Sequence, residues 1–154
     1  MKQETEQTIV AYTDGSCLGN PGHGGWAALL VIDGVEHVIT GFVPGITTNN
    51  VCELTAAIKA LEVLPVGGTA TVYSDSKYVV QGMTQWMNNW KRRGWKTYEK
   101  KPVANLELWK TLDALNSERS IEWLWVKAHN GHPENERVDA LANAEAQKGA
   151  EMSP

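Results

Sequence analysis

The chain has 154 residues and a formal net charge of −4, with 42% hydrophobic and 21% charged residues. This length and composition predict one soluble globular domain, and the longest apolar run, WAALLVI, is far shorter than the ~18 residues that a membrane span requires. The N-terminal MKQETEQ has neither the basic start nor the apolar stretch of a signal peptide, so we expect a cytoplasmic protein without a membrane partner. Cys17 and Cys52 lack the number and spacing of a disulfide framework or zinc site, which predicts free thiols.

Strand patterns come first along the chain. Residues 8–14 (TIVAYTD), 25–33 (GWAALLVID) and 36–43 (EHVITGFV) are separated by GNPGHGG and by Asp33-Gly34, both of which are typical of turns. An antiparallel meander is therefore predicted. The segment GNPGHGG lacks the GK[ST] of a nucleotide-binding loop and is interpreted as a connection between strands.

Helix and strand patterns alternate in the remainder. A helix is expected to start near Glu53, with an Asn or Thr just ahead as its cap, because apolar residues then recur at helical spacing. The chain continues with a buried strand at 70–75, a helix at 76–90 interrupted at Gly82, a helix at 105–116, a strand at 120–129 and a helix from Pro133.

This order predicts an α/β fold, a mixed five-stranded sheet in which an antiparallel meander is followed by parallel strands, with helices on both faces. The first and fourth strands would be parallel neighbours. Asp14 and Asp75 would then lie toward the carboxyl ends of adjacent strands, where open α/β sheets bind ligands. Neighbouring strands are about 4.8 Å apart and paired catalytic metals about 3.5–4 Å, so two such carboxylates are suitably spaced to share divalent ions.

Each candidate carboxylate also has an ordinary structural explanation. Asp-Gly and Asp-Ser often start turns, Glu53 at a helix start suits a capping or dipole role, and Asp139 beside Val138 resembles any exposed acid on a helix. The matching contexts YTDGS and YSDSK, each following a strand, favour a shared role for Asp14 and Asp75.

The positive charge is concentrated in one stretch. Residues 91–101 (KRRGWKTYEKK) hold six basic residues against one acid, a net +5 that leaves −9 on the rest of the chain. Such a run is often only a solvated face, but Trp86, Trp90, Trp95 and Tyr98 lie among these cations, as nucleic-acid binding requires. Periodicity alone does not distinguish stacking on bases from packing on a neighbouring helix.

Five segments together resemble type 1 ribonuclease H, and most of all the bacterial enzymes with a basic protrusion. They are TDGSCLGNPG (13–22), TTNNVCEL (47–54), YSDSKYVVQG (73–82), WKRRGWKTYEKKPVANLELW (90–109) and WVKAHNGHPENERVDALA (125–142). The resemblance implies the ribonuclease H fold and an endonuclease that hydrolyses the RNA strand of RNA/DNA hybrids, leaving 3′-hydroxyl and 5′-phosphate ends. It also implies a single catalytic domain at 1–154 with a basic protrusion at about 86–105, and a monomer is the default expectation.

By the same resemblance, Asp14, Glu53, Asp75 and Asp139 are the catalytic, metal-binding carboxylates. Hard oxygen ligands suit Mg²⁺, so two Mg²⁺ ions are expected with substrate bound, and Mn²⁺ is a possible substitute. Without metal these carboxylates would repel one another, so some should resist ionisation and titrate as a coupled set.

His129 matches a catalytic histidine of the family, on a loop before the last helix, that assists by proton transfer or product departure. Histidine as a residue type titrates near neutral pH, which suits that role. The residues alone leave open a histidine packed in the core or a zinc ligand with His132, although HNGHPE lacks the HExxH order and a cysteine partner.

The resemblance further implies contacts with the hybrid through polar groove residues and through the protrusion. These substrate-binding residues are Cys17, Asn20, Thr48, Asn49, Asn50, Gln81, Trp86, Lys91, Arg92, Arg93 and Lys96. They would touch 2′-hydroxyls and phosphates, which distinguishes RNA from DNA without reading sequence. Val51, Lys77 and Ala128 replace the arginine, glutamine and glycine that are frequent in bacterial relatives.

Three other functions remain open from the sequence. The first is another nuclease or strand-transfer enzyme on the same fold, which would share the acidic cluster. The second is a metal-independent ribonuclease that uses histidines and forms a 2′,3′-cyclic phosphate. The third is a catalytically silent hybrid-binding module, whose sign would be a broken carboxylate set.

Overall fold

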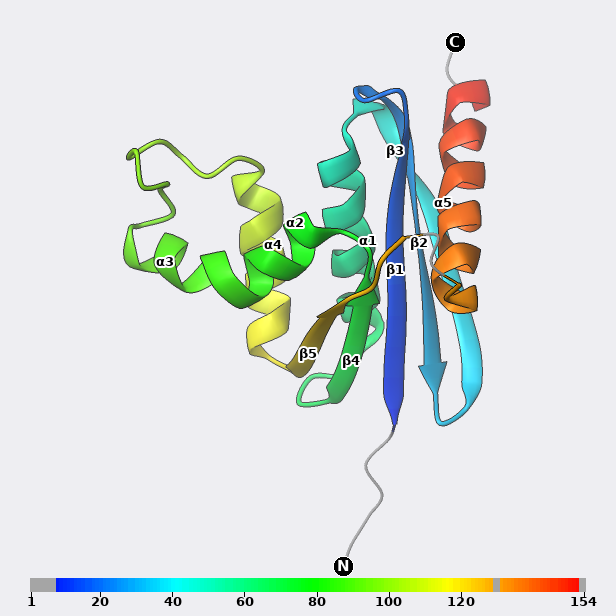
Figure 1. Ribbon diagram of the computed structural model, residues 1–154, viewed down its shortest axis with the longest axis horizontal. Helices are drawn as coiled ribbons and strands as arrows, with labels where there is room; N and C mark the ends of the chain where they lie inside the picture. Colours follow the sequence, from blue (N-terminus) through cyan, green and yellow to red (C-terminus); the bar gives the residue numbers. More distant parts are fainter. Residues whose placement is uncertain (1–7, 129–130, 153–154) are drawn as a thin grey trace, which may run out of the picture.

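The computed structural model describes residues 8–128 and 131–152 and contains a five-stranded sheet with the strand order β3-β2-β1-β4-β5 (Figure 1). Strands β1 (Ile9–Leu18), β2 (Gly22–Ile32) and β3 (Val35–Thr47) form an antiparallel meander. Strand β4 (Thr69–Ser74) pairs parallel with β1, and β5 (Ser120–Trp125) pairs parallel with β4. The predicted mixed sheet, including the parallel pairing of the first and fourth strands, is confirmed.

The meander extends further than the sequence pattern predicts. Residues 22–24 were expected in a connection but belong to β2, which pairs with β1 as far as Leu18. The glycines at this point explain the difference, since a Cβ at Gly24 would lie 2.2 Å from Cys52 Sγ and one at Gly25 2.4 Å from the Ala142 carbonyl oxygen. These glycines therefore bring both helical layers close to the strand, which local turn propensity does not reveal.

Helix α1 (Asn49–Val63) begins earlier than the expected start near Glu53. Thr48 caps it, because its side-chain oxygen accepts a hydrogen bond of 3.3 Å from the Val51 amide. The cap adds a turn ahead of Glu53, so that this carboxylate lies inside the helix and not at its first residue.

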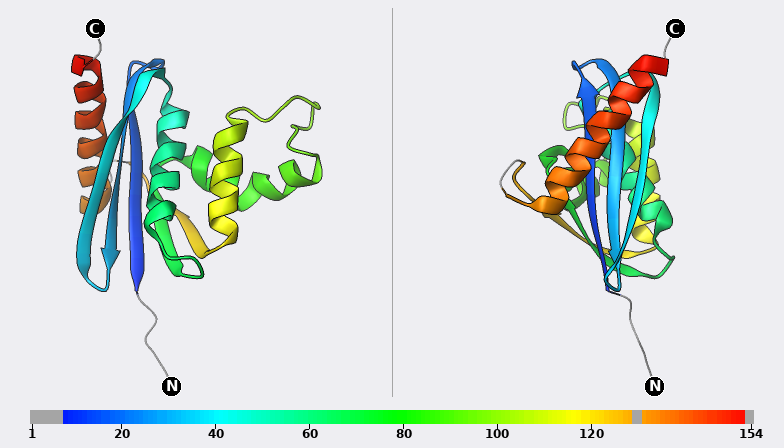
Figure 2. Two further views of the ribbon diagram at one scale, coloured as in Figure 1. Left: turned by 180° about the vertical axis from the view of Figure 1, so that it is seen from behind. Right: turned by 90° about the vertical axis from the view of Figure 1, so that its right-hand side faces the viewer.

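The helices cover both faces of the sheet, as predicted (Figure 2). Helix α1 and helix α4 (Leu106–Ser117) pack on one face around a core that includes Leu54, Leu61 and Trp109. Helix α5 (Pro133–Met152) packs on the opposite face through Val138 and Ala142. Within residues 8–128 and 131–152, none of the helices combines the length and the apolar character needed to cross a membrane.

The expected interruption at Gly82 is a change of helix type. Helix α2 (Lys77–Gln81) continues into a π-helical turn, η1 (Gly82–Trp86), and then into α3 (Met87–Arg92). A Cβ at Gly82 would lie 2.0 Å from the Trp109 ring, so only glycine lets the helix pass this side chain. The π turn redirects the chain, and α3 with the loop that follows projects from the sheet (Figure 1).

Candidate active site

Three carboxylates meet at the edge of the sheet where β1 and β4 approach their carboxyl ends. Asp14 lies in β1, Glu53 in α1, and Asp75 directly follows β4. One oxygen from each of them lies within 4.8 Å of the others. The structure thus brings together three of the four predicted metal ligands in a group small enough to hold a metal ion.

Gly15 makes the approach of β1 to α1 possible. A Cβ at this position would lie 2.3 Å from the carbonyl carbon of Cys52 and 2.4 Å from the Glu53 nitrogen. The Gly15 amide donates to Asp14 Oδ1 and to Glu53 Oε1, at 2.9 Å in both cases. One backbone N–H therefore holds two carboxylates at the same place.

Asp75 is held through its backbone by contacts on both sides. The Ser76 amide donates to Ser74 Oγ at 3.0 Å, and Trp125 Nε1 donates to the carbonyl oxygen of Asp75 at 3.0 Å. Trp125 was absent from the predicted site residues. Its alternation in the strand pattern SIEWLW indicated only one face of a sheet, and its bond to Asp75 depends on the pairing of β5 with β4.

Asp139 is half-buried in α5, and its charge adds to the negative charge of the three clustered carboxylates. It is not part of the compact group of three, but its charge raises the pKa values of both Asp14 and Asp75. Asn135, one turn earlier, is only 2% exposed, and its side chain lowers the pKa of Asp75. Sequence reasoning missed Asn135, which no pattern in HPENER distinguishes from its polar neighbours.

Burial and mutual repulsion keep protons on this cluster when no cation is bound. Burial first, and then the charges of Glu53, Asp75 and Asp139, raise the pKa of Asp14 to about 11. Burial and the Asp75 charge raise the pKa of Glu53 well above its usual range, although the Gly15 amide opposes this. Burial also raises the pKa of Asp75. This pattern agrees with the expectation that some of the carboxylates resist ionisation.

The donor set fits a hard divalent cation. Asp14 is 2% exposed, and its Oδ2 has no hydrogen-bond partner within the described part of the chain. A buried acceptor without a partner costs about 1–3 kcal/mol, and a cation would offset that cost. The three clustered ligand atoms are carboxylate oxygens, which favours Mg²⁺ or Mn²⁺ over the softer metals that prefer sulfur or imidazole.

The predicted groove residues lie around the start of α1. Asn20 Oδ1 accepts a hydrogen bond of 3.1 Å from the Asn49 amide, and Thr48 is the cap described above. The Cys17 thiol donates to the Gly19 carbonyl oxygen at 2.9 Å. Asn50 is exposed in the first turn of α1, whereas Gln81 is half-buried at the end of α2. Most of the predicted groove residues therefore lie either in the turn between β1 and β2 or at the start of α1.

The tryptophans of the protruding segment pack on one another. Trp86 and Trp90 have ring centroids 5.7 Å apart, and Trp90 and Trp109 5.1 Å apart. The Tyr78 hydroxyl accepts a hydrogen bond of 3.0 Å from Trp109 Nε1. The question that periodicity left open is resolved in favour of packing for these rings.

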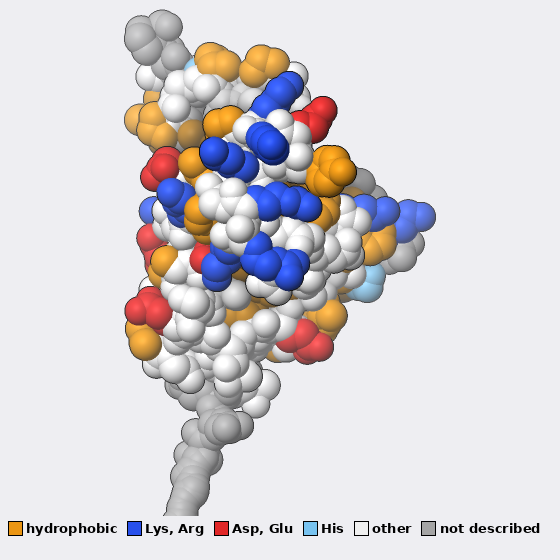
Figure 3. All heavy atoms as spheres, turned by 90° about the vertical axis from the view of Figure 1, so that its left-hand side faces the viewer, with side chains coloured by type: hydrophobic (Ala, Val, Ile, Leu, Met, Phe, Trp, Pro, Cys, Tyr) orange, Lys and Arg blue, Asp and Glu red, His pale blue; other side chains and the backbone are white. Residues whose placement is uncertain are grey.

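The cations of the same segment face outward. Lys91, Arg92, Arg93 and Lys96 are all exposed, and Figure 3 shows Lys and Arg side chains gathered on this side of the molecule. Lys91 pairs with Asp113 at 3.3 Å, and the Arg93 guanidinium lies 5.5 Å from the Tyr98 ring centroid. The segment therefore joins an aromatic interior to a basic surface.

His129, the remaining predicted catalytic residue, lies outside the described residues. His132 is exposed just ahead of α5. In residues 8–128 and 131–152, one group of metal-ligating side chains is found, that of Asp14, Glu53 and Asp75.

Fold and site together define a class of protein, the metal-dependent nucleases that place carboxylates on the central strands of a mixed five-stranded sheet. The model of the RNase H family matches residues 6–147. Ribonuclease H of Alcanivorax borkumensis is 54% identical over 137 residues, covering 89% of this chain and 90% of that protein. Ribonuclease H of Salmonella arizonae is 57% identical over 139 residues, covering 90% and 88%.

Solved structures agree with these matches. LC9-RNase H1, a type 1 RNase H with the type 2 active-site motif, has a TM-score of 0.83 and 30% identity, covering 96% of this chain and 76% of that one. LC11-RNase H1, solved in complex with an RNA/DNA hybrid, has a TM-score of 0.71 and 27% identity, covering 93% and 99%. The chain belongs to the ribonuclease H family, and it is an enzyme that hydrolyses the RNA strand of RNA/DNA hybrids.

Proposed function

We propose that this hydrolysis depends on two Mg²⁺ ions, with Mn²⁺ as a substitute, held by Asp14, Glu53, Asp75 and Asp139. The observation that carries the proposal is the group of three carboxylates within 4.8 Å, with the buried Asp14 Oδ2 left without a partner among the described residues. When bound, the ions would activate a water molecule and stabilise the leaving 3′ oxygen, giving 5′-phosphate and 3′-hydroxyl ends.

The residues of the chain would orient this chemistry. The Gly15 amide fixes Asp14 and Glu53 together, and Trp125 fixes the backbone of Asp75, so the ligand oxygens are preorganised on rigid elements. Asp139 would approach from α5 on the opposite side of the sheet from α1. His129 is proposed to transfer a proton or to assist product departure, as the resemblance implies.

We propose that the hybrid lies across the start of α1 and the basic protrusion at about 86–105 of a single catalytic domain. Cys17, Asn20, Thr48, Asn49, Asn50 and Gln81 would contact 2′-hydroxyls and phosphates, and Trp86, Lys91, Arg92, Arg93 and Lys96 would form the protrusion side of the site. The outward position of these cations and the hybrid bound by the LC11 neighbour support this arrangement.

We also propose a cytoplasmic monomer. The two cysteines of the chain, Cys17 and Cys52, are free thiols, which suits a reducing compartment. Burial raises the pKa of Cys52 to about 12, so this thiol is protected from reaction.

The test is cleavage of an end-labelled RNA/DNA hybrid beside single-stranded RNA, duplex RNA and duplex DNA, with Mg²⁺ or with chelator, for the wild type and Asp14→Asn. We expect cleavage of the hybrid alone, abolished by chelator and by the substitution. Glu122→Gln, which removes an exposed acid on β5 away from the acidic cluster, is the matched control and should cleave as the wild type does. A hybrid that is bound but uncut with every divalent ion would establish the silent module instead.

A further inference from the structure

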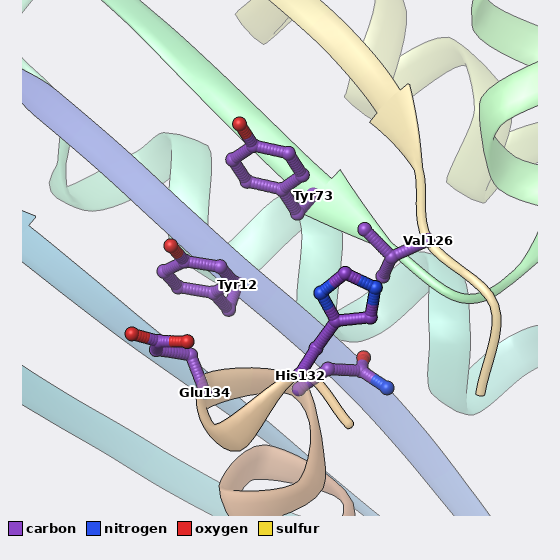
Figure 4. A pocket seen from close by; sticks show the side chains of 6 residues that line it. Tyr12, Tyr73, Val126, His132 and Glu134 are labelled. Atoms are coloured by element: carbon purple, nitrogen blue, oxygen red, sulfur yellow. The ribbon is translucent and has the colours of Figure 1, made fainter. Parts of the chain in front are cut away.

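A pocket of about 200 Å³ lies where the start of α5 faces β1 and β4 (Figure 4). Its lining residues come from β1, β4, the segment after β5 and the start of α5. They are Tyr12, Tyr73, Val126, His132, Glu134 and Asn135. None of them belongs to the metal or substrate residues proposed above.

Two tyrosines form the aromatic wall of this pocket. Tyr12 and Tyr73 are register partners on the parallel strands β1 and β4, and each stands two residues before an active-site aspartate. Residues two apart on a strand share one face and lie about 6.6 Å apart. The two tyrosines therefore lie about that far from the aspartates, toward the amino ends of the strands. The rings stack with their centroids 5.2 Å apart and an interplanar angle of 12°. Figure 4 shows the two rings side by side.

The charge that lines the pocket is negative. Glu134 extends beside Tyr12 in Figure 4, and no Lys or Arg is among the six lining residues. An anion would be repelled here, whereas a cation would gain both the carboxylate and the aromatic rings.

Asn135 supplies an acceptor that lacks a donor. The side chain is 2% exposed, and its Oδ1 has no hydrogen-bond partner within the residues that the structure describes. A buried amide oxygen without a hydrogen-bond donor is destabilising. A ligand N–H that reaches Oδ1 would remove this cost, which an aliphatic or purely aromatic ligand cannot do.

We propose that this pocket binds a small flat organic cation of the amidinium or guanidinium class. Such a head group is planar, stacks on aromatic rings and carries several N–H donors in a fixed arrangement, which suits Glu134 and Asn135 together. The volume admits one ring with its head group. Binding here requires neither hybrid nor divalent metal.

Benzamidine is the probe, titrated into the full chain with chelator and without nucleic acid, and followed by calorimetry and by backbone amide chemical shifts. We expect saturable binding, with shifts centred on residues 12, 73 and 134, and at least about tenfold weaker binding of the neutral isostere benzamide, since a hydrogen bond to a charged group contributes about 1.5–3 kcal/mol. Glu134→Gln should weaken benzamidine binding to a similar extent.

Glu136→Gln is the matched control, because Glu136 is also an acid in the first turn of α5 but does not line the pocket. It should leave benzamidine affinity unchanged. An equal loss of benzamidine affinity in Glu134→Gln and Glu136→Gln would show only a general attraction of cations to the acidic start of α5. Equal affinities for benzamide and benzamidine would exclude recognition of the cation. Either result overturns the proposal. A failure of hybrid cleavage would leave these measurements intact, so the two proposals fail independently.

Discussion

The indole N–H of Trp125 donates a hydrogen bond of 3.0 Å to the main-chain carbonyl of Asp75. Strand β5 thus fixes a carboxylate that follows β4, and the Lys77 ammonium lies 4.7 Å from the centroid of the same indole ring. Trp125 is 42% exposed, so its contribution to the core is small and its hydrogen bond to Asp75 is the more specific contact.

Trp125→Phe is predicted to lower kcat severalfold with little change in KM. The ring remains but its donor is lost, which frees the Asp75 backbone and costs about 1 kcal/mol of stability. Steady-state kinetics on the hybrid and urea unfolding measure the two effects. Lys77→Met is the control, because it keeps the Trp125 hydrogen bond and removes only the cation above the ring. An equal fall in kcat in Lys77→Met would assign the effect to the loss of the cation and not to the loss of the hydrogen bond.

The stability of the metal-free protein is predicted to fall as pH rises from about 4 toward 11. The folded-state pKa of Asp14 is about 11 against an ordinary value of 3.8, so between these values the folded state binds a proton that the unfolded state does not. Unfolding free energy therefore decreases with pH over this window. Urea unfolding in chelator at several pH values should show this slope, and Asp14→Asn should flatten it. An identical slope in that variant would contradict the prediction.

Mg²⁺ is predicted to raise the melting temperature of the wild type and to have a smaller effect on Asp14→Asn. A ligand that binds only the folded state at about 100 times its Kd stabilises it by about 2.7 kcal/mol. Differential scanning calorimetry with increasing Mg²⁺ measures this shift. Glu122→Gln should respond as the wild type does, because that acid lies outside the cluster.

Gly15→Ala is predicted to destabilise the protein by about 1–3 kcal/mol and to abolish most of the activity. The new Cβ would meet the α1 backbone at 2.3–2.4 Å, which forces α1 and Glu53 away from Asp14. Thermal unfolding and hybrid cleavage test both effects. Gly34→Asn serves as the control: Gly34 has a φ of +83°, which Asn tolerates, and a Cβ there meets nothing within 4 Å. Wild-type activity in Gly15→Ala would refute the role of this close approach.

Neutralising Lys91, Arg92, Arg93 and Lys96 together is predicted to raise KM and flatten its salt dependence, with little change in kcat. The slope of log affinity against log salt falls by about one for each phosphate contact removed. Lys91→Gln alone should have a smaller effect, since Asp113 already engages this cation. Lys59→Gln, on α1 in an exposed pair with Glu62, is a control for net charge. An unchanged salt slope would exclude hybrid binding by the protrusion.

Much of the fold follows from local patterns in the sequence. Period-two strands, helical repeats, the break at Gly82 and the two aspartates in YTDGS and YSDSK are short-range features, and each is confirmed in the structure. The extent of β2 and the start of α1 were predicted wrongly. The extent of β2 depends on glycines that allow a neighbouring helix to pack closely, and the start of α1 depends on a capping hydrogen bond. Hydrophobic periodicity reports neither kind of contact.

The sequence by itself determined the family, the mixed sheet and the four candidate carboxylates, because ordered motifs and hydrophobic periodicity are properties of the chain alone. The tertiary structure decided which atoms meet: the Gly15 amide between Asp14 and Glu53, the Trp125 indole on Asp75, and the packing of Trp86 and Trp90 in place of exposed stacking surfaces. The distances and the burial that set hydrogen bonds and pKa values arise only when β1, β4, α1 and α5 pack together.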